Sequence, residues 1–206
     1  MAFISSKYRF GATIAGALAV LAITAMPANA QLPDNRCPTV AMSQPFVPWM
    51  DFANYVLAPG GNMEADSAPW TLSGGAAIVA GNEPFYVGAS KDRLSLRLPA
   101  GSSAATAPMC LGIDYPTMRF FAKRDGGSLL SSLRVEAVFT NAAGQRQVVP
   151  ISAVTNAGVW SPTAPLPTVV NALAVVNPLQ VAFRFTPQHS SQWSIDDVYV
   201  DPYRTN

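Results

Sequence analysis

The chain has 206 residues, of which 50% are hydrophobic and 12% are charged, and 13 Lys and Arg against 12 Asp and Glu give a formal net charge of +1. A nucleic-acid footprint requires clustered Lys and Arg, and because no basic run occurs, we expect no nucleic-acid partner. The length suffices for one domain with a well-buried core.

The first thirty residues have the pattern of a secretory signal peptide. Lys7 and Arg9 form a basic start, an uncharged apolar run covers 11–26, and Ala28-Asn29-Ala30 has the small-x-small form of a cleavage site. The run is shorter than the roughly 20 residues that span a bilayer, which favours cleavage after Ala30 over a retained membrane anchor. We therefore expect a secreted or extracellular protein without a membrane partner. Its mature chain has eleven basic and twelve acidic residues, a net charge of −1.

Cys37 and Cys110 are the only two cysteines. An even cysteine count in an exported chain favours a disulfide, and two buried free thiols are the alternative. The bridge would close a loop of more than seventy residues. For a loop of that length the chain-entropy model predicts roughly 4 kcal/mol of stabilisation.

The mature chain opens with a proline-rich segment, residues 31–58. Proline lacks a backbone donor and fixes φ, so we expect neither a central strand nor a regular helix here. The segment nevertheless contains five large apolar side chains: Phe46, Trp49, Phe52, Tyr55 and Leu57. We predict an irregular apolar arm that packs on the surface of the core and is attached through Cys37.

Residues 59–206 have the pattern of short strands separated by turns. Apolar and polar residues alternate over 94–98, 133–139 and 181–185, and a period of two marks half-buried strands. Clusters of Gly, Asn, Asp and Pro between the strands indicate turns. Residues 168–176 are β-branched and flanked by prolines, which favours a loop or one short helical turn. We expect an all-β domain of about nine antiparallel strands in two sheets.

Two adjacent acids, Asp196 and Asp197, interrupt the last apolar segment, residues 193–200. A buried carboxylate is costly unless it is paired, hydrogen-bonded or bound to a metal. We therefore expect one of the two acids to have a fixed partner. Strict alternation places Asp197 on the face of Ile195 and Tyr199, and Asp196 on the opposite face.

Three segments of the domain follow one another in a recognisable order. Gly60-Gly61-Asn62-Met63-Glu64 is followed closely by Trp70, then by the alternating strand 94–99, and finally by the Ile-Asp-Asp-Val of 193–200. This order resembles the jelly-roll carbohydrate-binding modules and the wider galactose-binding-like fold, over about residues 59–202. The resemblance implies an antiparallel β-sandwich with jelly-roll topology. The closing Asp-Asp-Val-Tyr-Val-Asp-Pro also looks like that of small exported actinobacterial proteins of unknown function.

In many such modules a calcium ion joins the first strand to the last, and calcium takes six to eight oxygen ligands. The resemblance implies Glu64 as the opening ligand and Asp196 or Asp197 as the closing ligand. The residues leave a second interpretation open, in which these acids cap backbone amides or pair with an arginine such as Arg184. Under both interpretations the role of the acids is structural.

Catalytic signatures are weak in this sequence. The single histidine, His189, lies in a polar loop, and no Gly-x-Ser-x-Gly elbow accompanies it. One histidine and two cysteines are too few ligands for a catalytic zinc. Twelve acids are enough for a pair of glycosidase carboxylates, but no motif identifies such a pair. A hydrolase or lyase on the same fold is therefore only the third hypothesis.

Sugar binding requires exposed aromatic rings and a few directed polar groups. The candidate binding residues are the loop aromatics Phe85, Tyr86, Tyr115 and Trp160 and the strand residues Arg119, Arg134, Glu136 and Arg184. Trp70 and Trp193 are expected in the core, Trp160 either stacks on a ligand or packs, and Arg–Glu neighbours are also explained as cross-strand pairs. We predict a non-catalytic module for a glycan or other extracellular polymer. The alternative is a structural or adhesive cell-envelope protein that binds another protein.

Overall fold

The structure is a computed structural model that describes residues 37–38, 40–64, 70–155, 158–174 and 177–202. The expected signal peptide and the first residues of the arm lie outside these ranges. Within them, no helix is long and apolar enough to cross a membrane. The only helices of this part are two short 3₁₀ turns, η1 (Val47–Trp49) and η2 (Val170–Leu173). For residues 168–176, where the sequence favoured a loop or one short helical turn, the structure has the short turn.

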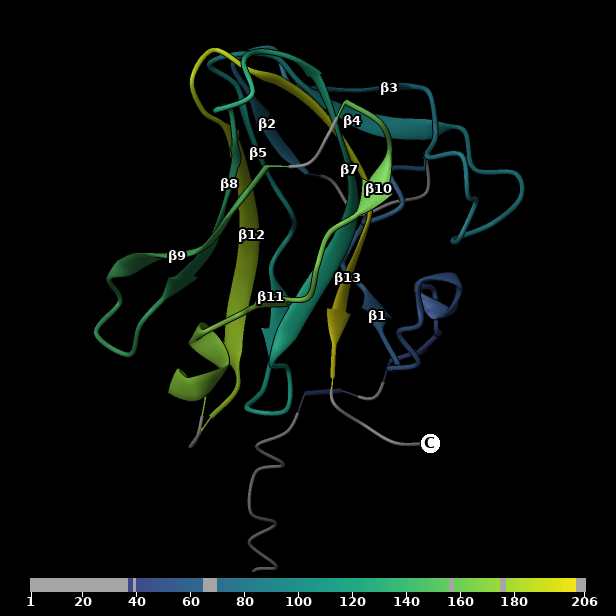
Figure 1. Ribbon diagram of the computed structural model, residues 1–206. Coiled ribbons are helices and arrows are strands. Elements are labelled where there is room, and N and C mark those ends of the chain that lie inside the picture. Colours follow the sequence, from purple (N-terminus) through teal and green to yellow (C-terminus); the bar gives the residue numbers. More distant parts are fainter. Residues whose placement is uncertain (1–36, 39, 65–69, 156–157, 175–176, 203–206) are drawn as a thin grey trace, which may run out of the picture. The chain divides into compact units, whose positions relative to one another are not determined.

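Thirteen strands of the described chain form two antiparallel sheets, which are the two layers in Figure 1. The first, which we call the arm-side sheet, has the order β10-β7-β13-β4-β3, with β1 beside β13 and β11 beside β7. Its strands are β1 (Val56–Leu57), β3 (Ala77–Ala80), β4 (Leu94–Leu98), β7 (Thr117–Gly126), β10 (Ser161–Pro162), β11 (Leu166–Pro167) and β13 (Gln192–Asp201).

The second, which we call the open sheet, has the order β2-β5-β12-β8-β9, with β6 beside β12. Its strands are β2 (Thr71–Ser73), β5 (Ser103–Ala105), β6 (Met109–Leu111), β8 (Leu133–Thr140), β9 (Arg146–Val154) and β12 (Leu179–Pro187). The predicted all-β jelly-roll sandwich is confirmed, with more and shorter strands than the nine expected.

The core lies between the sheets and is filled by the alternating apolar positions that the sequence indicates. The three predicted alternating segments, now β4, β8 and β12, bury their alternating apolar residues, except that Leu94 at the start of β4 is half-buried. Trp193 of β13 is fully buried, and Trp70 stacks on Phe185 of β12 with ring centroids 5.6 Å apart. Both tryptophans are core residues, as predicted.

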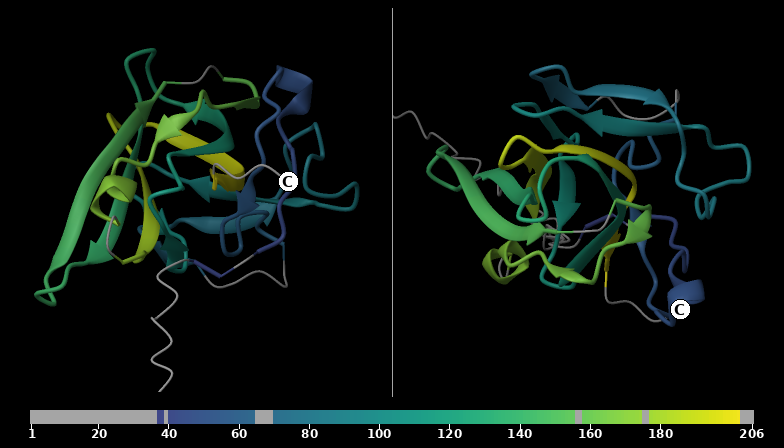
Figure 2. Two further views of the ribbon diagram at one scale, coloured as in Figure 1. Left: turned by 90° about the horizontal axis from the view of Figure 1, so that it is seen from below. Right: turned by 45° about the horizontal axis from the view of Figure 1, so that its top comes forward.

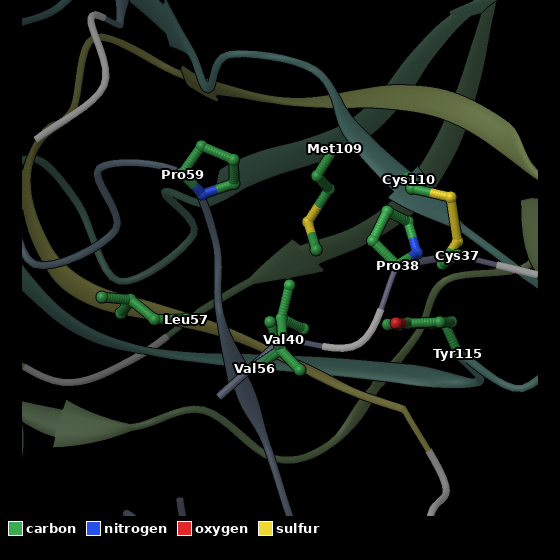
Figure 3. A pocket seen from close by; sticks show the side chains of 9 residues that line it. All are labelled: Cys37, Pro38, Val40, Val56, Leu57, Pro59, Met109, Cys110 and Tyr115. Carbon is green, nitrogen blue, oxygen red and sulfur yellow. A yellow bond between two sulfur atoms is a disulfide. The ribbon is translucent and has the colours of Figure 1, made fainter. Parts of the chain in front are cut away.

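A disulfide joins Cys37 to Cys110 of β6, with Cα atoms 5.5 Å apart. The bridge confirms the predicted pairing and fixes the start of the described arm against the open sheet. Figure 3 shows it beside Tyr115 and the side chain of Met109.

The arm crosses the outer face of the arm-side sheet. Ser43 and Tyr55 form an isolated bridge, and β1 at the end of the arm pairs with β13. Phe46 and Tyr55 are buried against Phe121 and Tyr199, which project outward from β7 and β13. The arm and β9 lie on opposite sides of the sandwich in Figures 1 and 2, so the outer face of the open sheet is left clear of the arm.

A β-bulge interrupts β13 at the two adjacent acids. The register of β13 against β7 shifts between Asp196 and Tyr199, and Asp197 has a φ of +49°. Ile195 and Val198 are both fully buried in the core. The strict alternation expected here is therefore wrong, because the extra residue gives Val198, instead of Asp197, the core position that follows Ile195.

Candidate functional site

The bulge lies where β13 changes neighbours. Before the bulge Ile195 pairs with β4, and after it Val200 pairs with β1. Between these partners, the Val198 carbonyl accepts from the Ala58 amide at 2.8 Å and the Val198 amide donates to the Gly61 carbonyl at 3.0 Å. The opening segment thus meets the closing strand at this point, as the resemblance implies.

A loop over residues 81–93 covers the bulge, and a backbone hydrogen bond of 2.8 Å between its first and last residues closes it. Glu83 stabilises the loop through hydrogen bonds from the loop's own backbone amides. Its carboxylate is fully buried and accepts from the backbone amides of Phe85 and Val87. The Glu83 amide in turn donates to Asp196 at 3.2 Å, which ties the loop to β13.

Glu64 and Asp196 both accept hydrogen bonds from backbone amides. Oε1 of Glu64 accepts from Arg93 and Leu94 at 2.7 and 2.9 Å. Oδ1 of Asp196 accepts from the Asp197 amide at 2.9 Å. Amide capping, the second interpretation of the sequence, therefore describes these two acids.

Asp92 and Asp197 differ from these acids because three of their four carboxylate oxygens have no hydrogen-bond donor in the described structure. The two residues are only 4% and 1% exposed, yet Oδ2 of Asp92 and both carboxylate oxygens of Asp197 have no hydrogen-bond donor in the described structure. The two side chains converge on Gly88. A β-carbon at that position would lie 2.7 Å from Asp92 Oδ2 and 3.0 Å from Asp197 Oδ1, so only glycine leaves space between them.

We refer to Glu83, Asp92, Asp196 and Asp197 as the acidic cluster. Burial, then the charges of Glu83 and Asp92, raises the pKa of Asp197 to about 8. Burial and the charge of Asp197 raise the pKa of Asp196 to about 9. Burial likewise raises the pKa of Asp92. In the described part of the chain no basic side chain forms an ion pair with the cluster, and the charge of Lys91 lowers the pKa of Asp92 by less than burial raises it.

The donor set of the acidic cluster fits a hard cation. The unpartnered carboxylate oxygens of Asp92 and Asp197 are ligands of the kind that calcium prefers. Within the described ranges, no group of three or more His, Cys, Asp or Glu side chains is placed so that it could hold a metal ion. An ion held here would therefore take further oxygens from backbone carbonyls or water.

The open sheet brings together three of the predicted binding residues. Glu136 of β8 stands directly opposite Arg184 of β12, whose Nε and Nη2 both donate to Glu136 Oε2 at 2.9 Å. Arg134 Nε lies 3.5 Å from Oε1 of the same carboxylate. Glu136 is 5% exposed beneath the two guanidinium groups. We refer to these three residues as the arginine clamp.

A hollow of about 280 Å³ opens on the same sheet, beyond the arginine clamp. It is lined by Pro108, Val138, Phe139, Thr140, Arg146, Gln180 and Ala182. The pair formed by Ala182 and Val138 is the next outward-facing pair after Arg184 and Glu136, so the hollow and the clamp are continuous. Arg146 of β9 is the only charged residue in the lining.

Two predicted binding residues are buried, and the expectation that they face a ligand is wrong. Tyr115 is 1% exposed and lies beside the disulfide, against a small apolar cavity of about 180 Å³ (Figure 3). Arg119 of β7 is 6% exposed. It pairs with Asp51, donates through Nε to the Thr163 carbonyl at 2.8 Å and covers the Phe46 ring at 4.2 Å.

The remaining predicted aromatics lie over the arm-side sheet, away from the arginine clamp. Phe85 and Tyr86 are exposed on the 81–93 loop, and Phe85 meets Trp49 of the arm edge to face, with centroids 4.9 Å apart. Trp160 is half-buried, and the Lys123 ammonium lies 5.5 Å from its ring centroid. The predicted aromatic and charged residues therefore do not form one site.

Sequence reasoning missed Glu83, Asp92 and Arg146. Glu83 and Asp92 belong to a loop with no strand periodicity, and only its closure brings them to β13. The available signal for Arg146 was its place after the Asn141–Gly144 turn, which makes it the first residue of a strand paired with β8.

No protein-family model and no curated protein matches the sequence. Solved structures with a similar fold include the family 22 carbohydrate-binding and family 10 glycoside hydrolase modules of a Clostridium thermocellum xylanase, complexed with xylohexaose. The identity is 13% and the TM-score 0.49, over 71% of this chain and 28% of that one. The chain therefore spans little more than a quarter of that protein.

A xylan-binding domain of family 22 from Paenibacillus barcinonensis gives 11% identity and a TM-score of 0.48, over 75% of this chain and 97% of that domain. A variant of a family 29 carbohydrate-binding module in complex with mannohexaose gives 10% identity and a TM-score of 0.44, over 71% and 90% of the two chains. With TM-scores below 0.5, these likenesses assign no ligand. The similarity to exported actinobacterial proteins stays a prediction.

Proposed function

We propose that the protein is an exported, non-catalytic binding module whose open sheet binds a glycan or another extracellular polymer. The observation that carries this proposal is the uncovered outer face of the open sheet, on which the arginine clamp and the hollow are continuous. The opposite sheet is covered by the arm and by the 81–93 loop, so the open sheet is the free face of the sandwich.

The outward positions of the open sheet suit hydrogen bonding to an extended polar chain. They are Thr71, Ser73, Ser103, Ala105, Cys110, Arg134, Glu136, Val138, Thr140, Arg146, Val148, Pro150, Ala153, Gln180, Ala182, Arg184 and Thr186. Small side chains near the centre permit close approach, while the arginines and glutamine offer donors in fixed directions. None of these described positions is aromatic, so we expect recognition through hydrogen bonds instead of ring stacking.

The proposal is tested on a glycan array with residues 31–206, followed by titration of each positive glycan. Arg184→Gln removes one of the two guanidinium groups of the arginine clamp and is expected to weaken binding at least tenfold. The matched control is Arg97→Gln, an exposed arginine on β4 of the other sheet. Circular dichroism checks that both variants fold. Absence of any glycan signal for the wild type overturns the proposal.

A cell-envelope protein that binds another protein is the second candidate, and the apolar surface of the arm favours it. Met50 and Phe52 of the arm are 79% and 61% exposed, and Phe85 and Tyr86 of the neighbouring loop are also exposed. Large exposed apolar patches often mark protein contacts. An empty glycan array combined with ordered oligomers in analytical ultracentrifugation would select this candidate.

The buried acids argue against the third hypothesis, a hydrolase or lyase. A glycosidase needs two carboxylates that flank the scissile bond in an accessible cleft. The carboxylates of the acidic cluster are at most 4% exposed and lie beneath a loop, so a polymer does not reach them.

We propose a structural calcium ion at the acidic cluster, held by Asp92 and Asp197. Their unpartnered oxygens support this assignment, and the ion would join the 81–93 loop to the bulge of β13. Calorimetric titration of chelator-treated protein with calcium chloride tests it, with magnesium chloride as the control for the smaller cation. Absence of a binding isotherm at millimolar calcium contradicts the assignment.

A further inference from the structure

The open sheet has an uneven charge distribution. Its outward positions include three arginines, Arg134, Arg146 and Arg184, against one acid, Glu136, a local net charge of +2 among the described strands. The whole chain is close to neutral, with 13 basic and 12 acidic residues. The free face is therefore a basic surface on a nearly uncharged protein.

The three arginines are not equivalent. Arg184 and Arg134 both lie against the Glu136 carboxylate, which neutralises part of their charge and fixes their orientation. Arg146 has no ion pair with any described residue. It stands opposite Thr140, four residues along β8 from Glu136, a distance of about 13 Å along a strand. Arg146 is exposed and lines the hollow, so it brings an uncompensated positive charge to it.

The surroundings of Arg146 match a sugar acid. A guanidinium group binds a carboxylate through two parallel hydrogen bonds. Gln180 and Thr140 in the lining offer donors and acceptors for hydroxyl groups, and Val138 and Ala182 provide a small apolar floor. Complementary charge contributes to specificity as well as to association rate.

We propose that the open sheet selects a polysaccharide that contains carboxylate groups, a polyuronate, and that Arg146 binds one carboxylate in the hollow. The inference rests on the proposed function of the open sheet and specifies its ligand class. The arginine clamp contacts the same polymer about 13 Å away along the strand. The contact is electrostatic at an exposed site, so binding weakens as ionic strength rises.

The test compares polygalacturonate with its fully methyl-esterified form, which has the same backbone without the charges. Alginate and neutral xylan extend the panel, and binding is measured by affinity electrophoresis at low and high salt. We expect at least tenfold preference for the acidic polymers and at least tenfold weaker binding by Arg146→Gln. Arg97→Gln on the opposite sheet is expected to bind as the wild type does.

The outcomes distinguish selection of polyuronates through Arg146 from glycan binding by the open sheet in general. Binding to xylan or the methyl ester that equals or exceeds binding to both polyuronates overturns the inference and leaves the glycan-binding module intact. Preference for polyuronates that survives Arg146→Gln unchanged overturns the assignment to the hollow. Failure to bind any polymer in the panel or on the glycan array overturns the proposed function itself.

Discussion

Two acidic sites lie on the outer side of the arm-side sheet, the half-buried Asp51 and the buried acidic cluster, and they are stabilised in different ways. Asp51 in the arm accepts from the Tyr55 hydroxyl at 2.7 Å and pairs with Arg119 of β7. Asp197, in the acidic cluster on β13, has no donor for either oxygen in the described structure. Each site connects the sheet to a segment that covers it, the arm in one case and the 81–93 loop in the other.

The pKa values of the two sites shift in opposite directions. Burial opposes ionisation of Asp51, but hydrogen bonds from Tyr55, Ala53 and Arg119 outweigh it, so the pKa of Asp51 is lowered. Burial and neighbouring carboxylates raise the pKa of Asp197 to about 8. Asp51 of the arm thus has its counter-ion, Arg119, within the chain. The acidic cluster beneath the 81–93 loop lacks such a positive charge, which a bound cation would supply.

The largest loss of stability is expected from breaking the ion pair between Asp51 of the arm and Arg119 of β7. Asp51→Asn leaves the guanidinium of Arg119 buried without its counter-ion, which typically costs about 3 kcal/mol. The free energy of unfolding from urea titration measures this loss. Asp125→Asn is the control, because Asp125 pairs with Lys123 in a half-exposed position and such pairs contribute about 0–1 kcal/mol. Equal losses in the two variants would contradict the role given to Asp51.

A smaller effect is expected from removing the cation from the acidic cluster. Calcium at a hundred times its dissociation constant stabilises the folded protein by about 2.7 kcal/mol, so a chelator lowers the melting temperature of the wild type. Asp197→Asn loses this calcium response. In chelator the variant is more stable than the wild type at pH 8, because it lacks an unpaired carboxylate. At pH 8 the variant is therefore the more stable protein in chelator, and the wild type is the more stable protein in calcium.

Gly88→Ala tests the same site without changing a charge, because the added β-carbon fills the space between Asp92 and Asp197. We expect it to abolish the calcium response. Gly126→Ala is the matched control, since the nearest side-chain atoms there lie at 3.9 Å. A wild-type calcium response in Gly88→Ala would place the ion elsewhere.

The pH dependence of stability should show opposite signs in the two regions. The folded-state pKa values of Asp196 and Asp197 are raised above 3.8 to about 9 and about 8. Their contribution is therefore fully present below about pH 4 and is lost as pH rises toward 8 or 9. The contribution of Asp51, whose pKa is lowered, is present above about pH 4 and is lost as pH falls further. Melting temperatures in chelator should fall between pH 5 and 9, and saturating calcium should flatten this slope. A rise over that range in chelator would contradict the assignment.

The sequence predicted the parts of the fold that depend on local pattern. Period-two alternation identified β4, β8 and β12, because a strand with one buried face repeats every two residues. The cysteine count predicted the Cys37–Cys110 bridge. The sequence named Arg184 as a possible partner of Glu64, Asp196 or Asp197, but it pairs with Glu136 instead. The confirmed features follow from short segments or from a residue count.

The bulge and the acidic cluster depend on contacts that no local pattern contains. The spacing of three residues between the apolar Ile195 and Val198 was a signal of the bulge, but strict alternation ignored it. Asp92 meets Asp197 only after the loop closes on β13, and Asp51 meets Arg119 only after the arm crosses the sheet. Such pairs are separated by many residues, so their partners become identifiable only in the folded chain.

The smallest change in stability is predicted for Glu64→Gln, a variant that tests whether Glu64 caps backbone amides or coordinates the proposed ion. Glu64→Gln keeps an oxygen that accepts from the Arg93 and Leu94 amides but removes the charge, so we expect a loss of about 1 kcal/mol or less. Because Glu64 caps amides and Asp197 faces the proposed ion, the calcium-induced rise in melting temperature should be unchanged in this variant. Glu64→Ala removes the acceptor as well and should cost more while keeping the same calcium response. A reduced response in Glu64→Gln would instead make Glu64 a ligand and extend the site across the opening segment.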